Sequence, residues 1–173
     1  LKADAMVRFT AIRALFTKAH SALVKKGSQD KTYLKLQQQI SEELLYIRFT
    51  SKTIERLCDS LRGMVESARG CERKIQQICV DKVRMPRPHF IKVFPGNEMN
   101  LDWVDIEIAA SQRTYAQTMT RNAPAIKEQQ QKLIDLQNYI GIPLKELKDI
   151  NKQMSTGEAK ARRAKREMTE ANL

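Results

Sequence analysis

Apolar residues recur every three or four positions along most of the chain, which is the period of an α-helix with one buried face. The first run covers residues 3–26, and Gly27–Ser28 is expected to end its helix and begin the next, which reaches about Arg48. The inner faces are expected to hold Met6, Phe9, Ile12, Phe16, Ala19 and Leu23 in the first helix, and Tyr33, Leu36, Ile40, Leu44 and Ile47 in the second. The pattern therefore predicts two consecutive amphipathic helices.

The strongest period follows, with apolar residues in a strict alternation of three and four. This seam consists of Ile54, Leu57, Leu61, Met64, Ala68, Cys71, Ile75 and Ile78. A helix from Lys52 to Arg84 would measure roughly 50 Å at about 1.5 Å per residue, and Ser51 suits its N-cap. Because two amphipathic helices precede the seam and can cover it, a free coiled coil is disfavoured. We expect an all-α fold, a helical bundle built on this one long central helix.

Local breakers organise the chain after this helix. Pro86 and Pro88 are expected to end it and to leave an irregular stretch as far as Met99. Asn100 can cap the short helix that follows, in which Trp103 is expected to be a core anchor rather than a stacking platform. The sequence thus predicts one short helix between two longer ones.

Two more helices are predicted in the last third. One should begin near Pro124, since proline suits the first helical position, and should end at Gly141. Pro143 then opens a short helical piece. Ser155 and Glu158 have the spacing of a capping box, in which the Ser hydroxyl and Glu carboxylate each accept from the other's amide. We therefore expect the last helix to start at Ser155.

Composition narrows the class of protein. The 173 residues carry a net charge of +11, which indicates either an anionic partner or simply a solvated basic surface. Cys58, Cys71 and Cys79 are odd in number and lack tight spacing, so we expect reduced thiols in the cytoplasm. No apolar run approaches the roughly 20 residues of a membrane span. A cytoplasmic protein with no membrane partner is expected.

The residues offer little for catalysis. His20 and His89 lie in different predicted elements, and neither has a carboxylate or cysteine at metal-ligand spacing. There is no glycine-rich phosphate loop and no nucleophile elbow. We therefore expect no enzyme, no catalytic residue, no metal site and no cofactor.

The last predicted helix carries a dense cationic cluster separated by alanines. Its members are Lys160, Arg162, Arg163, Lys165 and Arg166. They could contact phosphates or an acidic protein face, or they could be a solvated surface balanced by nearby glutamates. Ala161, Ala164 and Met168 recur at three and four, so we expect that side of the helix to pack on the rest of the chain.

Several runs of residues also resemble a known family, the primary sigma factors of bacterial RNA polymerase. Residues near the C-terminus resemble the start of conserved region two, in the ranges 148–151, 154–155, 157–168 and 170–173. Earlier residues resemble the long helical insert that precedes it, called the non-conserved region, at 79–80, 85–86, 90–91, 96–98 and Trp103. The resemblance implies two parts, residues 1–154 as the insert and residues 155–173 as the truncated first helix of region two. Lys152–Gln153 departs from the family, which has a pair of arginines there.

The resemblance implies a function. A sigma subunit binds core RNA polymerase and directs it to promoter DNA at the −10 and −35 elements, and region two docks on a coiled coil of the largest core subunit. The residues expected to contact nucleic acid or polymerase are Arg162, Arg163, Lys165, Arg166, Asn172 and Leu173.

Two further expectations concern the state of the chain. It starts at Leu1 rather than Met, and its helical pattern runs to the last residue, so we expect a fragment of a longer protein, monomeric by itself. The alternative is a stand-alone helical protein–protein interaction scaffold with no role in DNA recognition.

Overall fold

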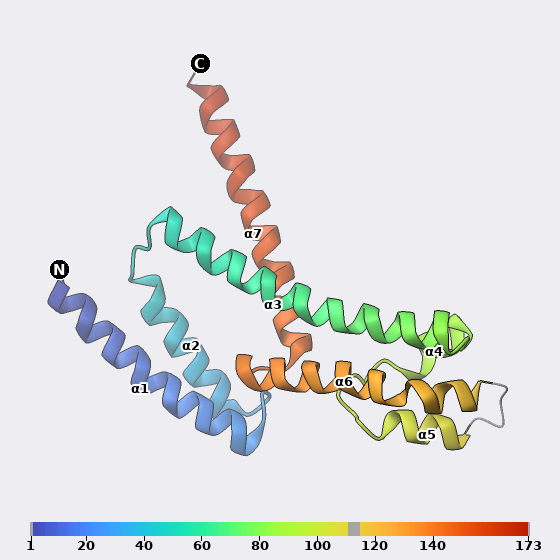
Figure 1. Cartoon of the computed structure of the whole chain (residues 1–173). Helices are drawn as coiled ribbons and strands as arrows, with labels where there is room; N and C mark the ends of the chain where they lie inside the picture. The colour runs from blue at the N-terminus through green and yellow to red at the C-terminus, as the bar shows by residue number, and fades with distance from the viewer. Residues whose placement is uncertain (1, 111–114, 173) are drawn as a thin grey trace. The chain divides into compact units, whose positions relative to one another are not determined.

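The computed structural model describes residues 2–110 and 115–172, which form helices joined by short connections (Figure 1). The elements are α1 (Lys2–Lys26), α2 (Lys31–Leu45), α3 (Ser51–Gln77), the π-helical turn η1 (Ile78–Lys82), α4 (Arg87–Val93), α5 (Trp103–Ala110), α6 (Ala116–Ile140) and α7 (Leu144–Ala171). These residues contain no strand, which confirms the all-α prediction. They fall into two compact units, an N-terminal unit (Leu1–Cys58) and a C-terminal unit (Asp59–Leu173).

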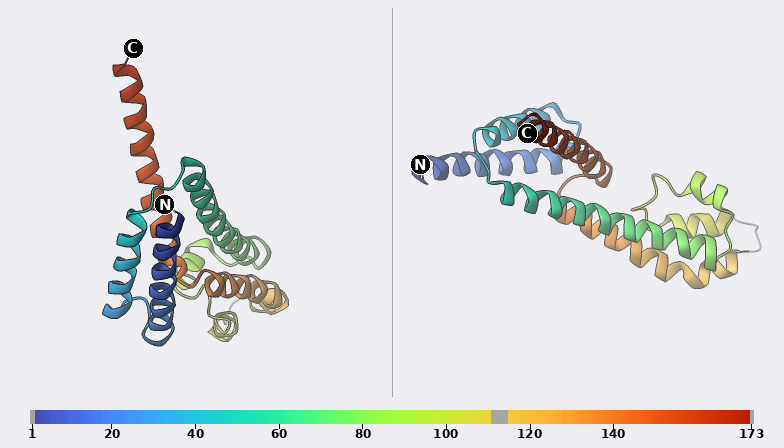
Figure 2. Two further views of the ribbon diagram at one scale, coloured as in Figure 1. Left: turned by 90° about the vertical axis from the view of Figure 1, so that its left-hand side faces the viewer. Right: turned by 90° about the horizontal axis from the view of Figure 1, so that it is seen from above.

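The N-terminal unit is a helical hairpin in which α1 and α2 lie side by side (Figures 1 and 2). Gly27 ends α1 as predicted, because its φ of 87° is open to glycine at little cost. The N-cap of α2 is Asp30, whose carboxylate accepts from the amides of Thr32 at 2.9 Å and Tyr33 at 3.1 Å. Local signals therefore account for the whole turn.

Fewer apolar side chains are buried in this hairpin than the sequence predicted. Ala19 and Tyr33 are buried, but Met6, Phe9 and Phe16 are exposed although they were expected on the inner face of α1. The prediction was wrong for these three because α2 alone covers only part of the apolar arc of α1. The apolar period thus identified the helix but overestimated how much of it is covered.

The long predicted helix is confirmed in extent, since α3 and η1 together run from Ser51 to Lys82. Thr50, rather than Ser51, provides the cap, because its hydroxyl accepts from the amide of Thr53 at 3.2 Å. Its seam is buried from the middle onward, with Ala68 and Ile75 fully inaccessible to solvent. The N-terminal end of the seam is exposed at Ile54 and Leu57, so only part of the seam serves the core.

The π-helical turn lets the chain turn into the core. Arg84 directly after it has a φ of 64°, which is unusual for a residue with a side chain. Val83 and Met85 on either side are each 1% exposed. Burial of these two neighbours stabilises the left-handed conformation of Arg84 against its local cost.

The C-terminal unit holds the main hydrophobic core, which lies between α3 with η1, α4, α5, α6 and the first turns of α7 (Figure 2). The buried members are Val65, Ala68, Ile75, Cys79, Val83, Met85, Phe90, Phe94, Trp103, Val104, Tyr115, Met119, Ile126, Leu133, Leu144 and Leu147. Burial of this apolar area is the principal stabilising contribution to the unit.

The stretch between the prolines and Met99 was predicted to be irregular, and that prediction was wrong. It contains α4, which presents Phe90 and Phe94 on one side with ring centroids 4.8 Å apart. Phe94 also meets Trp103 edge-on at 5.1 Å, and Trp103 is 3% exposed. The core-anchor reading of Trp103 is therefore confirmed, and the aromatic cluster explains why the short helix forms.

Two predicted helix starts were also wrong. α6 begins at Ala116 rather than near Pro124, because Tyr115 and Met119 are buried and hold its first turns in place. The proline lies inside the helix with an exposed ring. Gly141 ends α6 as predicted, with a φ of 80°.

The capping box at Ser155 does not form, since α7 runs unbroken through it. Thr156 instead donates its hydroxyl back to the carbonyl of Lys152 at 3.0 Å, and the Glu158 carboxylate accepts from Arg62 of α3. Gly157 lies inside this exposed helix and lowers its stability by only about 1 kcal/mol. The alanine- and arginine-rich segment that follows has a high helix propensity and tolerates this cost. The last helix therefore starts at Leu144, after Pro143.

Candidate functional site

Helix α7 has two dissimilar halves. Leu144 and Leu147 at its start are buried in the core of the C-terminal unit. Every residue from Ala159 to Asn172 is exposed, and this half extends away from the other helices of the unit (Figures 1 and 2). The second half is therefore a surface helix that carries the predicted contact residues.

The cationic cluster is divided by ion pairs within the helix. Arg163 Nε lies 2.7 Å from Glu167 Oε1, and Arg166 Nε lies 3.7 Å from a Glu170 carboxylate oxygen. Among the described residues, neither Arg162 nor Lys165 makes an ion pair or side-chain hydrogen bond. Lys160 makes none in these residues either, but at about 100° per residue it lies on another side of the helix, so Arg162 and Lys165 are the available cations that share one side.

The direction of the two available cations follows from the helix itself. The side of α7 that meets the rest of its unit holds Leu144, Leu147 and Glu158. At about 100° per residue, Arg162 and Lys165 continue that same side one turn further on. They therefore lie in line with the packed face, beyond the point where packing ends.

The predicted packing of Ala161, Ala164 and Met168 on the rest of the chain is wrong. All three are exposed, and Met168 is 67% accessible. The recurrence of small and apolar residues at three and four was a real pattern, but it lies on a different side of the helix from the packed one.

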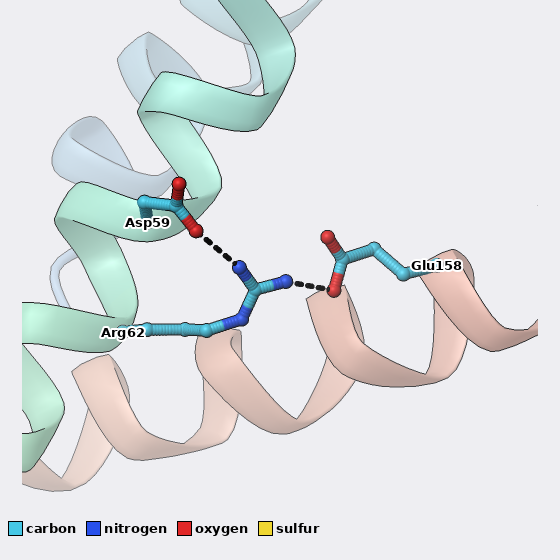
Figure 3. A network of polar contacts seen from close by, with 3 residues as sticks. All are labelled: Asp59, Arg62 and Glu158. Atoms are coloured by element: carbon cyan, nitrogen blue, oxygen red, sulfur yellow. Dashed lines mark hydrogen bonds and ion pairs between the residues drawn. The ribbon is translucent and has the colours of Figure 1, made fainter.

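Two ion pairs join α7 to α3. Arg62 donates to Glu158 and, at 2.7 Å, to Asp59 of its own helix (Figure 3). The hydrogen bond that Arg62 donates to Glu158, together with the negative charges of Glu158 and Asp59, raises the pKa of the Arg62 guanidinium. Lys148, which directly follows the buried Leu147, pairs with Glu72 of α3. These contacts tie α7 to α3 on the core side of the exposed half.

The two remaining predicted contact residues lie at the end of the helix. Asn172 is exposed and forms the C-cap of α7, with its amide 3.3 Å from the carbonyl of Thr169. Leu173 lies outside the described residues.

A buried polar cluster was missed by sequence reasoning. Glu107 is 8% exposed, and its Oε1 accepts from the Tyr115 hydroxyl at 3.0 Å and lies 2.5 Å from His89 Nε2. Burial, and then the nearby Glu107 charge, raises the pKa of the Cys79 thiol to about 12. A thiol with such a pKa is protonated at neutral pH, so Cys79 is a structural residue and not a nucleophile. The cluster joins α4, α5 and the start of α6.

Gln130 is a second buried polar residue, fully inaccessible to solvent. Its amide nitrogen donates to the carbonyls of Asn97 at 3.0 Å and Asn100 at 2.9 Å, which holds the connection between α4 and α5. A glutamine four residues after the buried Ile126 was the available sequence signal, since it stands on an apolar face.

The described residues, 2–110 and 115–172, also bear on a metal site and on a membrane span. No three His, Cys, Asp or Glu side chains in them converge as metal ligands. No helix in the same ranges is both long and apolar enough to cross a bilayer.

Comparison with known proteins identifies the family to which the sequence is similar. Residues 1–137 match the family described as Sigma-70, non-essential region. All 173 residues align at 39% identity with the RNA polymerase sigma factor RpoD of Neisseria gonorrhoeae. The chain spans 27% of the length of that relative.

Proposed function

This chain belongs to the sigma-70 family and covers its non-essential region, and on that premise we propose that it is part of a transcription-initiation sigma factor. The whole protein would bind core RNA polymerase and direct it to promoter DNA, and it would be a subunit rather than an enzyme. We place it in the cytoplasm and expect the chain by itself to be monomeric. The family match favours this role over that of a stand-alone scaffold.

We assign residues 1–154 to the insert. We assign residues 155–173, most of which lie in the second half of α7, to the first helix of region two. The supporting observation is the exposed half of α7, on one side of which Arg162 and Lys165 make no ion pair among the described residues. We propose that this side of α7, with Asn172 and Leu173 at its end, approaches the coiled coil of the largest polymerase subunit or the promoter phosphates. Long-range attraction to an anionic partner would speed and orient docking.

The test uses the complete sigma factor with Arg162→Glu and Lys165→Glu together. Holoenzyme assembly and open-complex formation at moderate salt should be weakened at least tenfold, because like charges would then face the anionic partner. The matched control is Lys160→Glu with Arg163→Glu, which makes the same change of charge at exposed positions on the other side of the same helix. It should have a clearly smaller effect.

Circular dichroism provides the folding control for both double variants. Wild-type assembly by the Arg162 and Lys165 variant would mean that these side chains belong to a solvated surface. Equal losses from the two double variants would mean that net charge matters and the side of the helix does not.

A further inference from the structure

A polar groove lies in the C-terminal unit where α3 and α7 cross. Its larger cavity, about 680 Å³, is lined from α3 by Arg69 and from α7 by Lys148, Asp149 and Lys152, among others. A second cavity of about 370 Å³ shares Arg69 and Lys148 and so continues the groove. The two cavities together form one elongated concave surface.

The charges of the groove are only partly balanced. Lys148 is paired with Glu72. In the described part of the chain Arg69 and Lys152 make no ion pair within 4 Å and no side-chain hydrogen bond, although the Glu66 carboxylate is near enough to Arg69 for their charges to interact. Arg69 and Lys152 are both exposed residues, and they line the same cavity from different helices. Two unpaired cations converging from two elements favour an anionic group between them.

The second cavity adds an apolar wall. Phe90 and Phe94 of α4 line it, with Glu98 and the shared Arg69 on its rim. The two rings are stacked and only 6% and 5% exposed, so core packing holds in place the small part of each that reaches the cavity. A rigid aromatic wall beside cations suits a ligand that combines carboxylates with an apolar side chain.

We propose that this groove docks an acidic peptide segment of a partner protein, with its carboxylates on Arg69 and Lys152 and an apolar side chain against Phe90 and Phe94. The inference does not rest on the proposed role of the exposed half of α7. A peptide fits better than a nucleic-acid strand, because the groove also presents the carboxylates of Asp149, Glu72 and Glu98 as hydrogen-bond acceptors. The same carboxylates can accept hydrogen bonds from peptide amides, which phosphodiesters lack.

Asn151 supports this choice of ligand. It lines the larger cavity, and its side-chain oxygen is buried with no hydrogen-bond partner in the described ranges. No bond to that oxygen therefore fixes the orientation of the amide, which is left able to turn toward a ligand. A buried acceptor without a partner also costs stability in the unliganded chain.

The probe is a short fluorescein-labelled peptide of glutamate pairs separated by leucines, titrated into the 173-residue chain and followed by fluorescence anisotropy. Arg69→Glu with Lys152→Glu should weaken its binding at least tenfold. The control, Arg87→Glu with Arg121→Glu, makes the same change of charge at exposed positions outside the groove. It should leave the affinity within about twofold, since distant exposed charges are largely screened.

Two further arms separate a docking site from general attraction. Asn151→Leu should weaken peptide binding severalfold without lowering the melting temperature, because it removes an unpaired buried acceptor. A peptide with aspartate pairs and glycines in place of leucines should bind more weakly than the leucine peptide. The proposal is overturned if the leucine peptide does not bind, if both charge variants weaken it equally, or if a duplex DNA of matched charge binds the groove as well as the peptide does.

Discussion

The two units are built from similar amphipathic helices but bury very different amounts of them. In the N-terminal unit α1 and α2 cover each other along one narrow strip, and Phe16 and Leu45 remain 60% and 84% exposed. In the C-terminal unit α3 and η1 share one core with α4, α5, α6 and the start of α7, and Ile75 and Ile126 are fully inaccessible. Helical periodicity therefore shows that a face exists, whereas its burial depends on how many other elements meet there.

This difference has an energetic consequence. Stabilisation by burial is roughly proportional to the apolar area removed from water, at about 25 cal/mol per Å². A two-helix hairpin removes much less area per residue than a multi-helix core, so we expect the N-terminal unit to open first. Four changes test this comparison, in order of decreasing expected effect.

Replacing Ile75 with Asp should destabilise the C-terminal unit by more than about 4 kcal/mol, because an unpaired charge would enter a fully buried site. Phe16→Asp is the matched change in the N-terminal unit and should cost within about 0.5 kcal/mol, since that side chain is exposed. Thermal melts by circular dichroism measure both. Equal shifts in the two variants would remove the contrast between the units.

Tyr33→Ala should cost about 3 kcal/mol, since Tyr33 is one of the two buried apolar side chains of the hairpin. Because the hairpin has little other buried area, the loss should unfold it alone. Hydrogen exchange by mass spectrometry should show protection lost in residues 2–58 and kept in α5 and α6. A parallel loss in those two helices would show that the units are coupled.

Glu107→Leu should destabilise the C-terminal unit by about 2 kcal/mol, because the buried Tyr115 hydroxyl and His89 lose their acceptor. Adding Tyr115→Phe should restore part of the loss by removing one unpaired donor. Chemical denaturation of the single and double variants gives the coupling energy. Strict additivity would mean that the hydroxyl and the carboxylate do not depend on each other.

The smallest effect is expected at the N-cap Asp30. Burial alone would raise the pKa of this carboxyl, but hydrogen bonds from the Tyr33 amide and from Thr32, with the nearby Lys26 charge, lower it overall. A lowered folded-state pKa stabilises the hairpin above the unfolded-state value near pH 4, and this contribution is lost as pH falls through the folded-state pKa. Asp30→Ala should therefore reduce hairpin stability at pH 7 but not at a pH below the folded-state pKa of Asp30, as hydrogen exchange or acid melts can measure. An unchanged pH dependence would exclude the cap from this role.

The candidate site was predictable from the sequence in its charge but not in its geometry. The arginines and lysines of the last helix are evident as a cluster, and their exposure followed from their chemistry. The unbroken helix puts Arg162 and Lys165 in line with the face that Leu147 packs, and the intrahelical pairs leave those two available. The side of the helix that carries function could not be read from Ala161, Ala164 and Met168, because spacing alone does not reveal where the neighbouring helices lie.

The sequence by itself determined which segments are helical and several of their ends. The apolar seam of α3, the glycine after α6 and the asparagine before α5 each act within one or two turns of backbone. The amide of Asp102, for example, meets the Asn100 side chain at 3.1 Å as the local pattern required. Such signals depend only on neighbouring residues, so they survive whatever the rest of the chain does.

The tertiary structure alone decided where local signals are overruled. A cap or a proline changes the free energy of a helix by about 1 to 3 kcal/mol, and one buried aromatic or aliphatic side chain contributes a similar amount. Several buried side chains act together, so their sum exceeds the local signal. The burial of Tyr115 and Met119 therefore stabilises the turns of α6 that precede Pro124. The aromatic cluster likewise stabilises α4 as a helix. The ion pair between Glu158 and Arg62 likewise engages the carboxylate that a cap at Ser155 would have used. Each of these outcomes depends on residues distant in the chain, which only folding brings together.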